Sequence, residues 1–148
     1  MTEADMVWVA GDQAGPADME RLGLVAIVKV STEGGVASGF VDAIIDTGAS
    51  TSCIDTTLAA SIGLTAEGFA EHHVIGGGLS RIPLARCAIG FQGGAIFRDL
   101  LQVGLADLEG QCAVLIGRDV LAHGRLLADF RSGVWALYMD RHKVISSA

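Results

Sequence analysis

Apolar residues recur at alternate positions along most of the chain, which is the period of half-buried β-strands. The stretches "LGLVAIVKV" (22–30) and "FVDAIID" (40–46) follow this pattern, and the turn-rich "STEGGVASG" between them predicts a hairpin. A second hairpin is predicted over 71–91, where "GGG" joins two β-like stretches, and a third over "RLLADF" and "GVWALYM". Further strands fit "STSCI", "AIFRDLLQVGLA" and "AVLIG". The pattern therefore predicts a mostly β protein.

Helical signals are few. The stretch "DTTLAASIGL" (55–64) predicts a short helix with Asp55 as its N-cap and Gly63 as its C-terminal stop, and a second short helix fits 118–124. Residues 1–21 are predicted to form a loose arm or an edge strand, and 22–148 the main domain, since 148 residues suit one domain.

Composition and charge narrow the class of protein. Hydrophobic residues make up 51% of the chain, yet no uninterrupted apolar run approaches the ~18 residues of a membrane span. The start "MTEADMVWVAGD" is acidic where a secretory signal would be basic, which favours a cytoplasmic protein without a membrane partner. The net charge of −7 and the lack of a basic cluster argue against nucleic acid as a partner.

The metal-binding residue types do not cluster in the sequence. Cys53, Cys87 and Cys112 form no CxxC pair, and three cysteines fit reduced thiols better than a disulfide framework. Four histidines are scattered, so we expect neither a metal nor another cofactor.

One carboxylate ends an apolar run in "AIIDTGAS" (43–50). An ionised aspartate after such a run is costly to desolvate unless hydrogen-bond donors or a partner compensate it. Asp46 is therefore either the exit of a strand into a solvated turn or a carboxylate held for chemistry.

"IIDTGAS" and "VLIGRDVL", taken together and about seventy residues apart, resemble the motifs of retropepsin-like aspartic proteases. The likeness covers roughly residues 22 to 140. It implies a closed, mostly β barrel with one or two short helices and a flap hairpin. It also implies an aspartic endopeptidase that acts on protein or peptide substrates. Because the chain contains a single Asp-Thr-Gly, we expect a homodimer that contributes one Asp46 from each subunit.

In this family two such aspartates share a proton over a bound water. Like charges about 3 Å apart at an effective dielectric constant near 20 repel by roughly 5 kcal/mol, so one carboxylate stays ionised while the other keeps its proton. The ionised member can take a proton from water while the acid member protonates the peptide carbonyl.

The same resemblance assigns supporting roles around Asp46. Gly48 has no Cβ, so its backbone can approach the carboxylate and donate to it, and Thr47 would brace the two loops across the symmetry axis. The loop continues through Ala49 and Ser50, where retroviral members carry an acidic residue instead of Ser50.

The second motif is expected to pack beneath this loop. Ile116 and Gly117 match the packed segment, and Arg118 begins the terminal helix. Because Ser50 is not acidic, Asp119 is either the partner of Arg118 or an N-cap. The flap and substrate-binding residues are expected to be Val74, Ile75, Gly76, Gly77, Gly78 and Leu79.

Two other classes of function fit parts of the pattern. A non-catalytic module on the same fold would bind an extended peptide or dimerise. Phosphoryl transfer also uses aspartates at strand ends, but it needs further Mg²⁺-ligating acids and a phosphate cradle, and no P-loop or Asp-x-Asp pattern is present. Metal-independent peptide cleavage would separate the protease from both.

Overall fold

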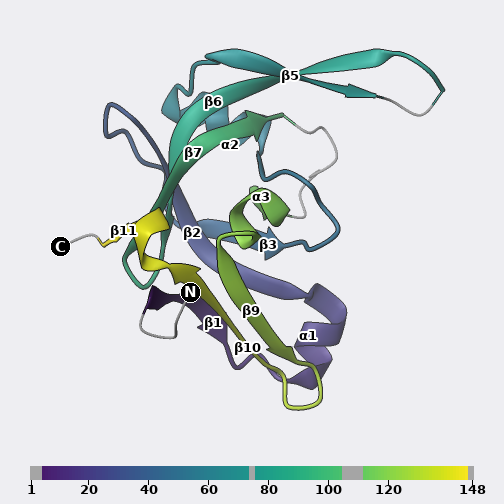
Figure 1. Ribbon diagram of the computed structural model, residues 1–148, viewed down its shortest axis with the longest axis vertical. Coiled ribbons are helices and arrows are strands. Elements are labelled where there is room, and N and C mark those ends of the chain that lie inside the picture. The colour runs from purple at the N-terminus through teal and green to yellow at the C-terminus, as the bar shows by residue number, and fades with distance from the viewer. Residues whose placement is uncertain (1–4, 74–75, 105–111, 147–148) are drawn as a thin grey trace.

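The structure, a computed structural model, describes residues 5–73, 76–104 and 112–146. It is mostly β with three short α-helices among the described residues (Figure 1). The elements in chain order are β1 (Met6–Asp12), α1 (Pro16–Leu22), β2 (Leu24–Thr32), β3 (Val41–Ile45), β4 (Cys53–Ile54), α2 (Thr56–Ile62), β5 (Gly68–His73), β6 (Leu79–Phe91), β7 (Ala95–Val103), β8 (Val114–Ile116), α3 (Arg118–Leu121), β9 (Gly124–Asp129), β10 (Val134–Asp140), the 3₁₀ helix η3 (Arg141–Lys143) and β11 (Val144–Ser146).

Six strands pair in a closed circuit. The circuit runs β2–β3–β8–β4–β7–β6 and returns to β2, with parallel pairing at β3–β8 and β4–β7. Closure leaves no free edge in the circuit itself, because each strand has neighbours on both sides. The parallel β3–β8 pair places the end of β3 beside the end of β8, which brings the two sequence motifs together.

The three predicted hairpins are confirmed. β2 pairs antiparallel with β3, β5 with β6 across the triple glycine, and β9 with β10. In Figure 1 the β5–β6 hairpin extends outward from the circuit as the long arm at the top. The predicted helix at 55–64 is also confirmed as α2, in which the Asp55 carboxylate accepts hydrogen bonds from Thr57 N and Leu58 N and Gly63 ends the helix in the left-handed conformation.

The first and last strands pair within the chain. β1 pairs antiparallel with β10, so the order of the second sheet is β1-β10-β9, and β11 pairs with β7. These terminal strands therefore extend the sheets of their own subunit.

The helix α1 brings the number of α-helices among the described residues to three, whereas one or two were expected. Pro16 stands in its first turn, Arg21 in its last turn, and Gly23 follows its end with φ of 74°. These are start and stop signals for a helix, but the seven-residue segment is too short to show a helical period. Its Met19 is 1% exposed, so packing of that side chain stabilises a helix that its length alone would not.

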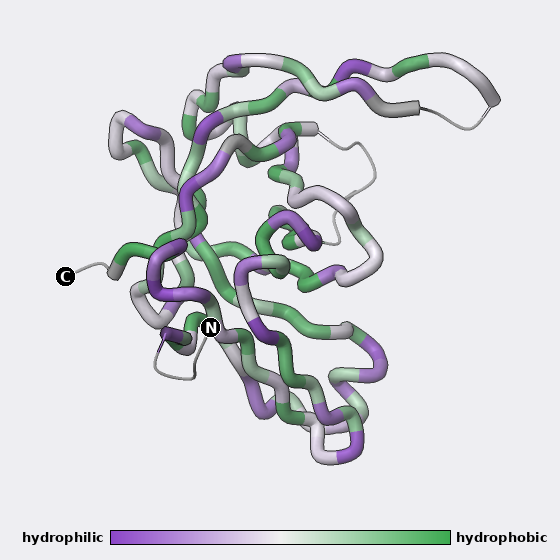
Figure 2. The backbone as a smooth tube through the Cα atoms, in the orientation of Figure 1, coloured by the Kyte–Doolittle hydropathy of each residue, from purple (hydrophilic) through white to green (hydrophobic). Residues whose placement is uncertain are grey.

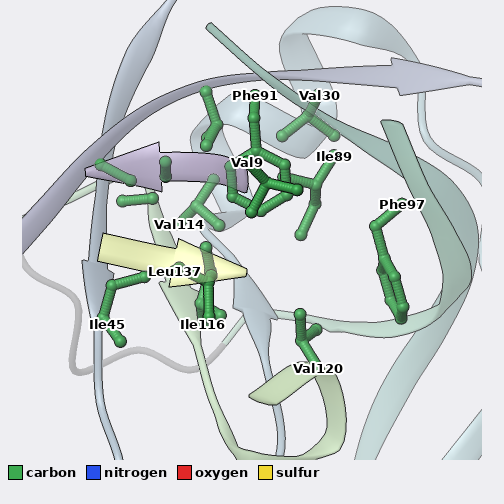
Figure 3. Packing of buried hydrophobic residues seen from close by; sticks show 14 of the residues in the cluster. Val9, Val30, Ile45, Ile89, Phe91, Phe97, Val114, Ile116, Val120 and Leu137 are labelled. Atoms are coloured by element: carbon green, nitrogen blue, oxygen red, sulfur yellow. The ribbon is translucent and has the colours of Figure 1, made fainter. Parts of the chain in front are cut away.

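One hydrophobic core joins the two sheets. Side chains from strands of both sheets and from α3 converge there, as Figure 3 shows for Val9, Ile89, Phe91, Val114 and Leu137. Figure 2 shows the matching pattern along the backbone, with the central strands β2 and β3 largely hydrophobic. None of the described helices has the length and apolar character needed to cross a bilayer.

Candidate active site

The Asp46 loop begins where β3 ends against β8. The backbone N–H of Asp46 donates to the carbonyl of Ile116 at 2.8 Å, which continues the parallel β3–β8 pairing by one residue. Ala49 N then donates to the carbonyl of Asp46 at 3.2 Å and closes a tight turn. The turn leaves the Asp46 side chain half-buried, while Thr47, Gly48 and Ser50 are exposed and Ala49 is half-buried.

The Asp46 carboxylate is held by its own loop. Gly48 N donates to Oδ1 of Asp46 at 2.8 Å. A Cβ at residue 48 would come within 3.1 Å of that oxygen, which is closer than nearly all such contacts, so glycine suits the approach. A hydrogen bond to a carboxylate oxygen fixes the orientation of the carboxylate.

Gly117 lies directly beneath the loop. Its backbone N–H donates to Oγ of Ser52 at 2.8 Å, and a Cβ there would lie 2.8 Å from the backbone of Thr51 and 2.9 Å from the carbonyl oxygen of Ala49. Such distances are shorter than real Cβ contacts, so only glycine allows the second motif to pack this close. The expected packing of Ile116 and Gly117 under the loop is therefore observed.

Arg118 binds the loop rather than an acidic side chain. Its guanidinium donates from Nη1 to the carbonyl oxygen of Thr47 at 2.7 Å, and its backbone N–H donates to the carbonyl of Ala49 at 2.9 Å. The backbone of the residue after Asp46 thus supplies the acceptor for the Arg118 guanidinium, whose partner the sequence left open.

Both sequence alternatives for Asp119 are wrong. Its carboxylate accepts from Ser52 N at 2.9 Å, from Ser52 Oγ at 2.6 Å and from Val120 N at 2.9 Å. The residue that caps α3 is Gly117, with no side-chain hydrogen bond. The helix itself is also shorter than predicted, four residues from Arg118 to Leu121.

Ser52 is a site residue that the sequence motifs did not reveal. It is fully buried, donates its hydroxyl to Asp119 and accepts from Gly117 N, so it joins the loop to the second motif. The sequence carries only a weak signal for this role, a hydroxyl next to the apolar Cys53 and Ile54. Cys53 is also fully buried, which fits a small core residue.

The flap residues fall partly within the described structure. Gly76, Gly77 and Gly78 have φ of 102°, 88° and 129°, a backbone that side-chain-bearing residues rarely adopt, and Leu79 begins β6 with 57% of its surface exposed. Val74 and Ile75 lie outside the described residues. Across the hairpin, the guanidinium of Arg81 lies 4.4 Å from the ring centre of Phe69.

The described residues contain no group of three or more His, Cys, Asp or Glu side chains that could hold a metal ion. The chemistry available at the loop is that of a positioned carboxylate.

A closed, mostly β domain whose Asp-Thr-Gly turn packs on a Gly-Arg-Asp helix start defines the retropepsin-like class of aspartic proteases. The chain belongs to the aspartyl protease family, whose model matches residues 28–120, a range that includes the Asp-Thr-Gly and the Gly-Arg-Asp. No curated protein matches the chain significantly.

A solved structure has the same fold. A retropepsin-like aspartic protease from Rickettsia conorii aligns with a TM-score of 0.51 and 14% sequence identity, covering 90% of each chain. The retroviral protease-like domain of Ddi1 from Leishmania major aligns with a TM-score of 0.44 and 16% identity, covering 84% of this chain and 94% of that domain.

Proposed function

We propose that this protein is a homodimeric aspartic endopeptidase in which two Asp46 carboxylates activate one water molecule. The observation that carries the proposal is the Asp46 carboxylate at the end of β3, oriented by Gly48 N, in a loop fixed by Ile116 and Arg118. Orientation of the reacting carboxylate before substrate arrives lowers the barrier, because the loop needs little rearrangement during the reaction.

One chain supplies half of the catalytic pair. The sequence has one Asp-Thr-Gly and no Asp-Ser-Gly. A two-fold axis beside the loop would bring the same residue of two subunits together, since an isologous contact places identical patches opposite each other. Thr47, which is exposed next to Asp46, would then brace the two loops across the axis.

The reaction follows general acid–base chemistry. The ionised Asp46 takes a proton from water as the water oxygen bonds to the carbonyl carbon, and the protonated Asp46 gives its proton to the carbonyl oxygen. In the second step the C–N bond breaks and the leaving nitrogen takes a proton from the carboxyl group that received it from water. A hydroxyl of the intermediate returns its proton to the other Asp46 carboxylate, which restores the pair with one proton. The products are a carboxylic acid and an amine, with no covalent enzyme intermediate.

The substrate would be an extended peptide beneath the β5–β6 flap. An extended backbone can pair with strand edges while alternate side chains enter apolar pockets. Leu79 and the predicted contacts Val74 and Ile75 would face it, and the positive φ angles of Gly76 to Gly78 support a flap turn that admits substrate.

The experiment that tests the proposed activity incubates a diverse peptide library with wild type or with Asp46→Asn and maps the cleavage products by mass spectrometry. The Asn variant is nearly isosteric but cannot ionise, so we expect cleavage to disappear while the circular dichroism spectrum is retained. Asp42→Asn is the matched control, because Asp42 is an exposed carboxylate on the same strand and should leave cleavage intact.

Undiminished cleavage by folded Asp46→Asn would refute the assignment. Peptide binding without any cleavage by wild type would support the non-catalytic module instead.

A cytoplasmic location is part of the same proposal. Its support is that Cys53, Cys87 and Cys112 are all free thiols, as expected in a reducing compartment. Cell fractionation tests it, and recovery of the protein outside the cytoplasmic fraction would contradict it.

A further inference from the structure

The outward face of β2, β6 and β7 carries a groove that is separate from the Asp46 loop. The groove has a volume of about 560 Å³ and is bounded on one side by the turn of residues 31–39. This turn precedes β3, whereas Asp46 follows the other end of the same strand. In Figure 1 the turn projects on the left, while the β5–β6 hairpin extends to the right. A ligand in this groove would therefore lie away from the proposed catalytic pair.

Strand register places three basic side chains around Ala88. Ala88 lies between Ser31 of β2 and Arg98 of β7. Lys29 stands two residues before Ser31, and Arg86 two residues before Ala88, so all five side chains share one face of the sheet. This is the outer face, because the residues that alternate with them belong to the core: Val28, Val30, Cys87, Ile89 and Phe97.

The groove has a small floor and a positively charged lining. Ala88 is 6% exposed although it is on the outer face, so the longer side chains around it form the walls. Among the described residues that line the groove, Lys29, Arg86 and Arg98 are basic and only Glu33 is acidic, which leaves two net positive charges. The whole chain has a net charge of −7, so this local excess is not a general property of the surface.

Two of the basic side chains have no acidic partner in the part of the chain that the structure describes. Neither Lys29 nor Arg98 takes part in a salt bridge there, although the chain contains 17 acidic residues. The Lys29 ammonium group lies 5.8 Å from the centre of the Phe40 ring, a contact that leaves its charge unneutralised. Both cations can therefore bind an anion.

Arg86 is positioned by two carboxylates. Its Nε lies 3.3 Å from Oε1 of Glu33 and 3.6 Å from Oε2 of Glu67. A guanidinium group has five N–H donors, and these two pairs do not use those on the Nη atoms. An anion in the groove would bind these donors and would be repelled by Glu33, which lines the same groove.

Hydrogen bonds fix the turn beside the groove before any ligand binds. Thr32 N donates to the carbonyl of Val36 at 2.8 Å, Val36 N donates to Thr32 Oγ1 at 3.1 Å, and Ser38 N donates to the carbonyl of Val30 at 2.8 Å. Ser31 and Thr32 also line the groove and add hydroxyl groups to it. A preformed wall lowers the cost of ordering the site when a ligand binds.

We propose that this groove binds a small molecule through a phosphate group, with Lys29, Arg86 and Arg98 as the cationic contacts. A phosphate monoester carries roughly two negative charges at neutral pH, which match the net charge of the lining. Guanidinium groups bind phosphate through paired N–H donors, and the ammonium group binds it as a point charge. Donors that come from three strands around one floor suit a tetrahedral oxyanion better than a planar carboxylate.

The first test is isothermal titration calorimetry at constant ionic strength with inorganic phosphate, AMP and citrate. We expect at least one of the two phosphates to bind more tightly than citrate. Tighter binding of AMP would identify a phosphorylated organic molecule as the ligand, and binding of inorganic phosphate at least as tight would identify free phosphate. Citrate binding as tight as that of both phosphates, or no phosphate binding up to about 10 mM, would overturn the proposal.

The second test removes one positive charge at a time. Lys29→Gln and Arg98→Gln should each weaken phosphate binding by about tenfold, because each removes a charge-assisted hydrogen bond. Arg131→Gln is the matched control, since it makes the same charge change in the turn between β9 and β10 and should bind like wild type. Equal weakening by all three variants would show attraction by net charge rather than a site, and would refute the proposal.

The third test changes affinity in the opposite direction. Glu33→Gln removes the negative charge that lines the groove, so phosphate binding should tighten several-fold. Glu20→Gln makes the same charge change on an exposed residue of α1 and should leave the affinity unchanged. Circular dichroism verifies that both variants are folded. Unchanged or weaker binding by folded Glu33→Gln would contradict a phosphate bound beside Arg86.

Discussion

At the scale of single residues, Ser52 holds the Asp46 loop to the second motif. Its hydroxyl takes part in two hydrogen bonds between segments more than sixty residues apart, donating to Asp119 and accepting from Gly117 N. It has no solvent contact, so water cannot replace either bond when the hydroxyl is removed.

Ser52→Ala should therefore destabilise the protein by about 1–3 kcal/mol, because it leaves Gly117 N–H without an acceptor and takes one donor from the Asp119 carboxylate. Chemical denaturation measures this change. Ser61→Ala is the matched control, since the Ser61 hydroxyl donates to Leu58 O on the exposed side of α2, and should change stability by less than about 0.5 kcal/mol. Equal effects of the two variants would contradict a bracing role for Ser52.

The thiol of Cys87 makes the stability of the fold depend on pH in the alkaline range. Burial, with a smaller contribution from the charge of Asp99, raises the pKa of its thiol to about 12 from 9.0. A thiol whose pKa is higher in the folded than in the unfolded state stabilises the fold fully at pH values below its unfolded-state pKa. That stabilisation is lost as the pH rises from the unfolded-state pKa to the folded-state pKa.

Between about pH 8 and about pH 10, wild type should lose about 1.4 kcal/mol of unfolding free energy through this thiol. Cys87→Ala removes the titrating group, so its stability should fall less over the same range, whatever its stability at neutral pH. Denaturation curves at the two pH values measure the difference. Parallel pH profiles for the two proteins would show that Cys87 is not the group responsible.

At the scale of elements, the flap hairpin depends on three consecutive glycines. Gly77 has φ of 88°, where a side chain costs roughly 1–2 kcal/mol. Gly68 lies on β5 of the same hairpin, where an added Cβ would meet no atom within 4 Å and φ is not positive.

Gly77→Ala should therefore lower kcat/KM for peptide cleavage by roughly tenfold, because the flap turn must shift to relieve the strain. Gly68→Ala should keep wild-type kinetics. Steady-state kinetics on one library-derived peptide makes the comparison. Similar kinetics for both variants would mean that the triple-glycine turn does not contribute to substrate binding.

Whether a helix or strand can be predicted from the sequence depends on how far apart in the chain the residues that stabilise it lie. The predicted hairpins and α2 are set by local signals such as strand alternation, glycine turns and the Asp55 cap, and these predictions are confirmed. α1 carries local signals too, but its seven residues depend on the burial of Met19 against distant strands. Short helices are stabilised mainly by tertiary packing, so their existence is poorly predicted from sequence.

At the scale of the whole molecule, the proposed dimer shares one catalytic pair between two chains. When wild type is mixed with an equal amount of Asp46→Asn under subunit exchange, random pairing leaves about one quarter of the dimers fully wild type. Activity per wild-type chain should then drop to about half. Native mass spectrometry verifies exchange, and peptide cleavage gives the activity. Unchanged activity per wild-type chain after proven exchange would mean that each subunit carries a complete site.

The sequence by itself determined the strand-rich character, the hairpins and the position of Asp46 at the end of an apolar strand, because each of these depends on residues within a few positions of one another. The tertiary structure decided the partners of Arg118 and Asp119. Arg118 binds Thr47, 71 residues away, and Asp119 binds Ser52, 67 residues away. The pairing of β8 with β3 on one side and with β4 on the other brings those segments into contact. A backbone carbonyl or a buried hydroxyl leaves no mark in the sequence that distinguishes it as an acceptor.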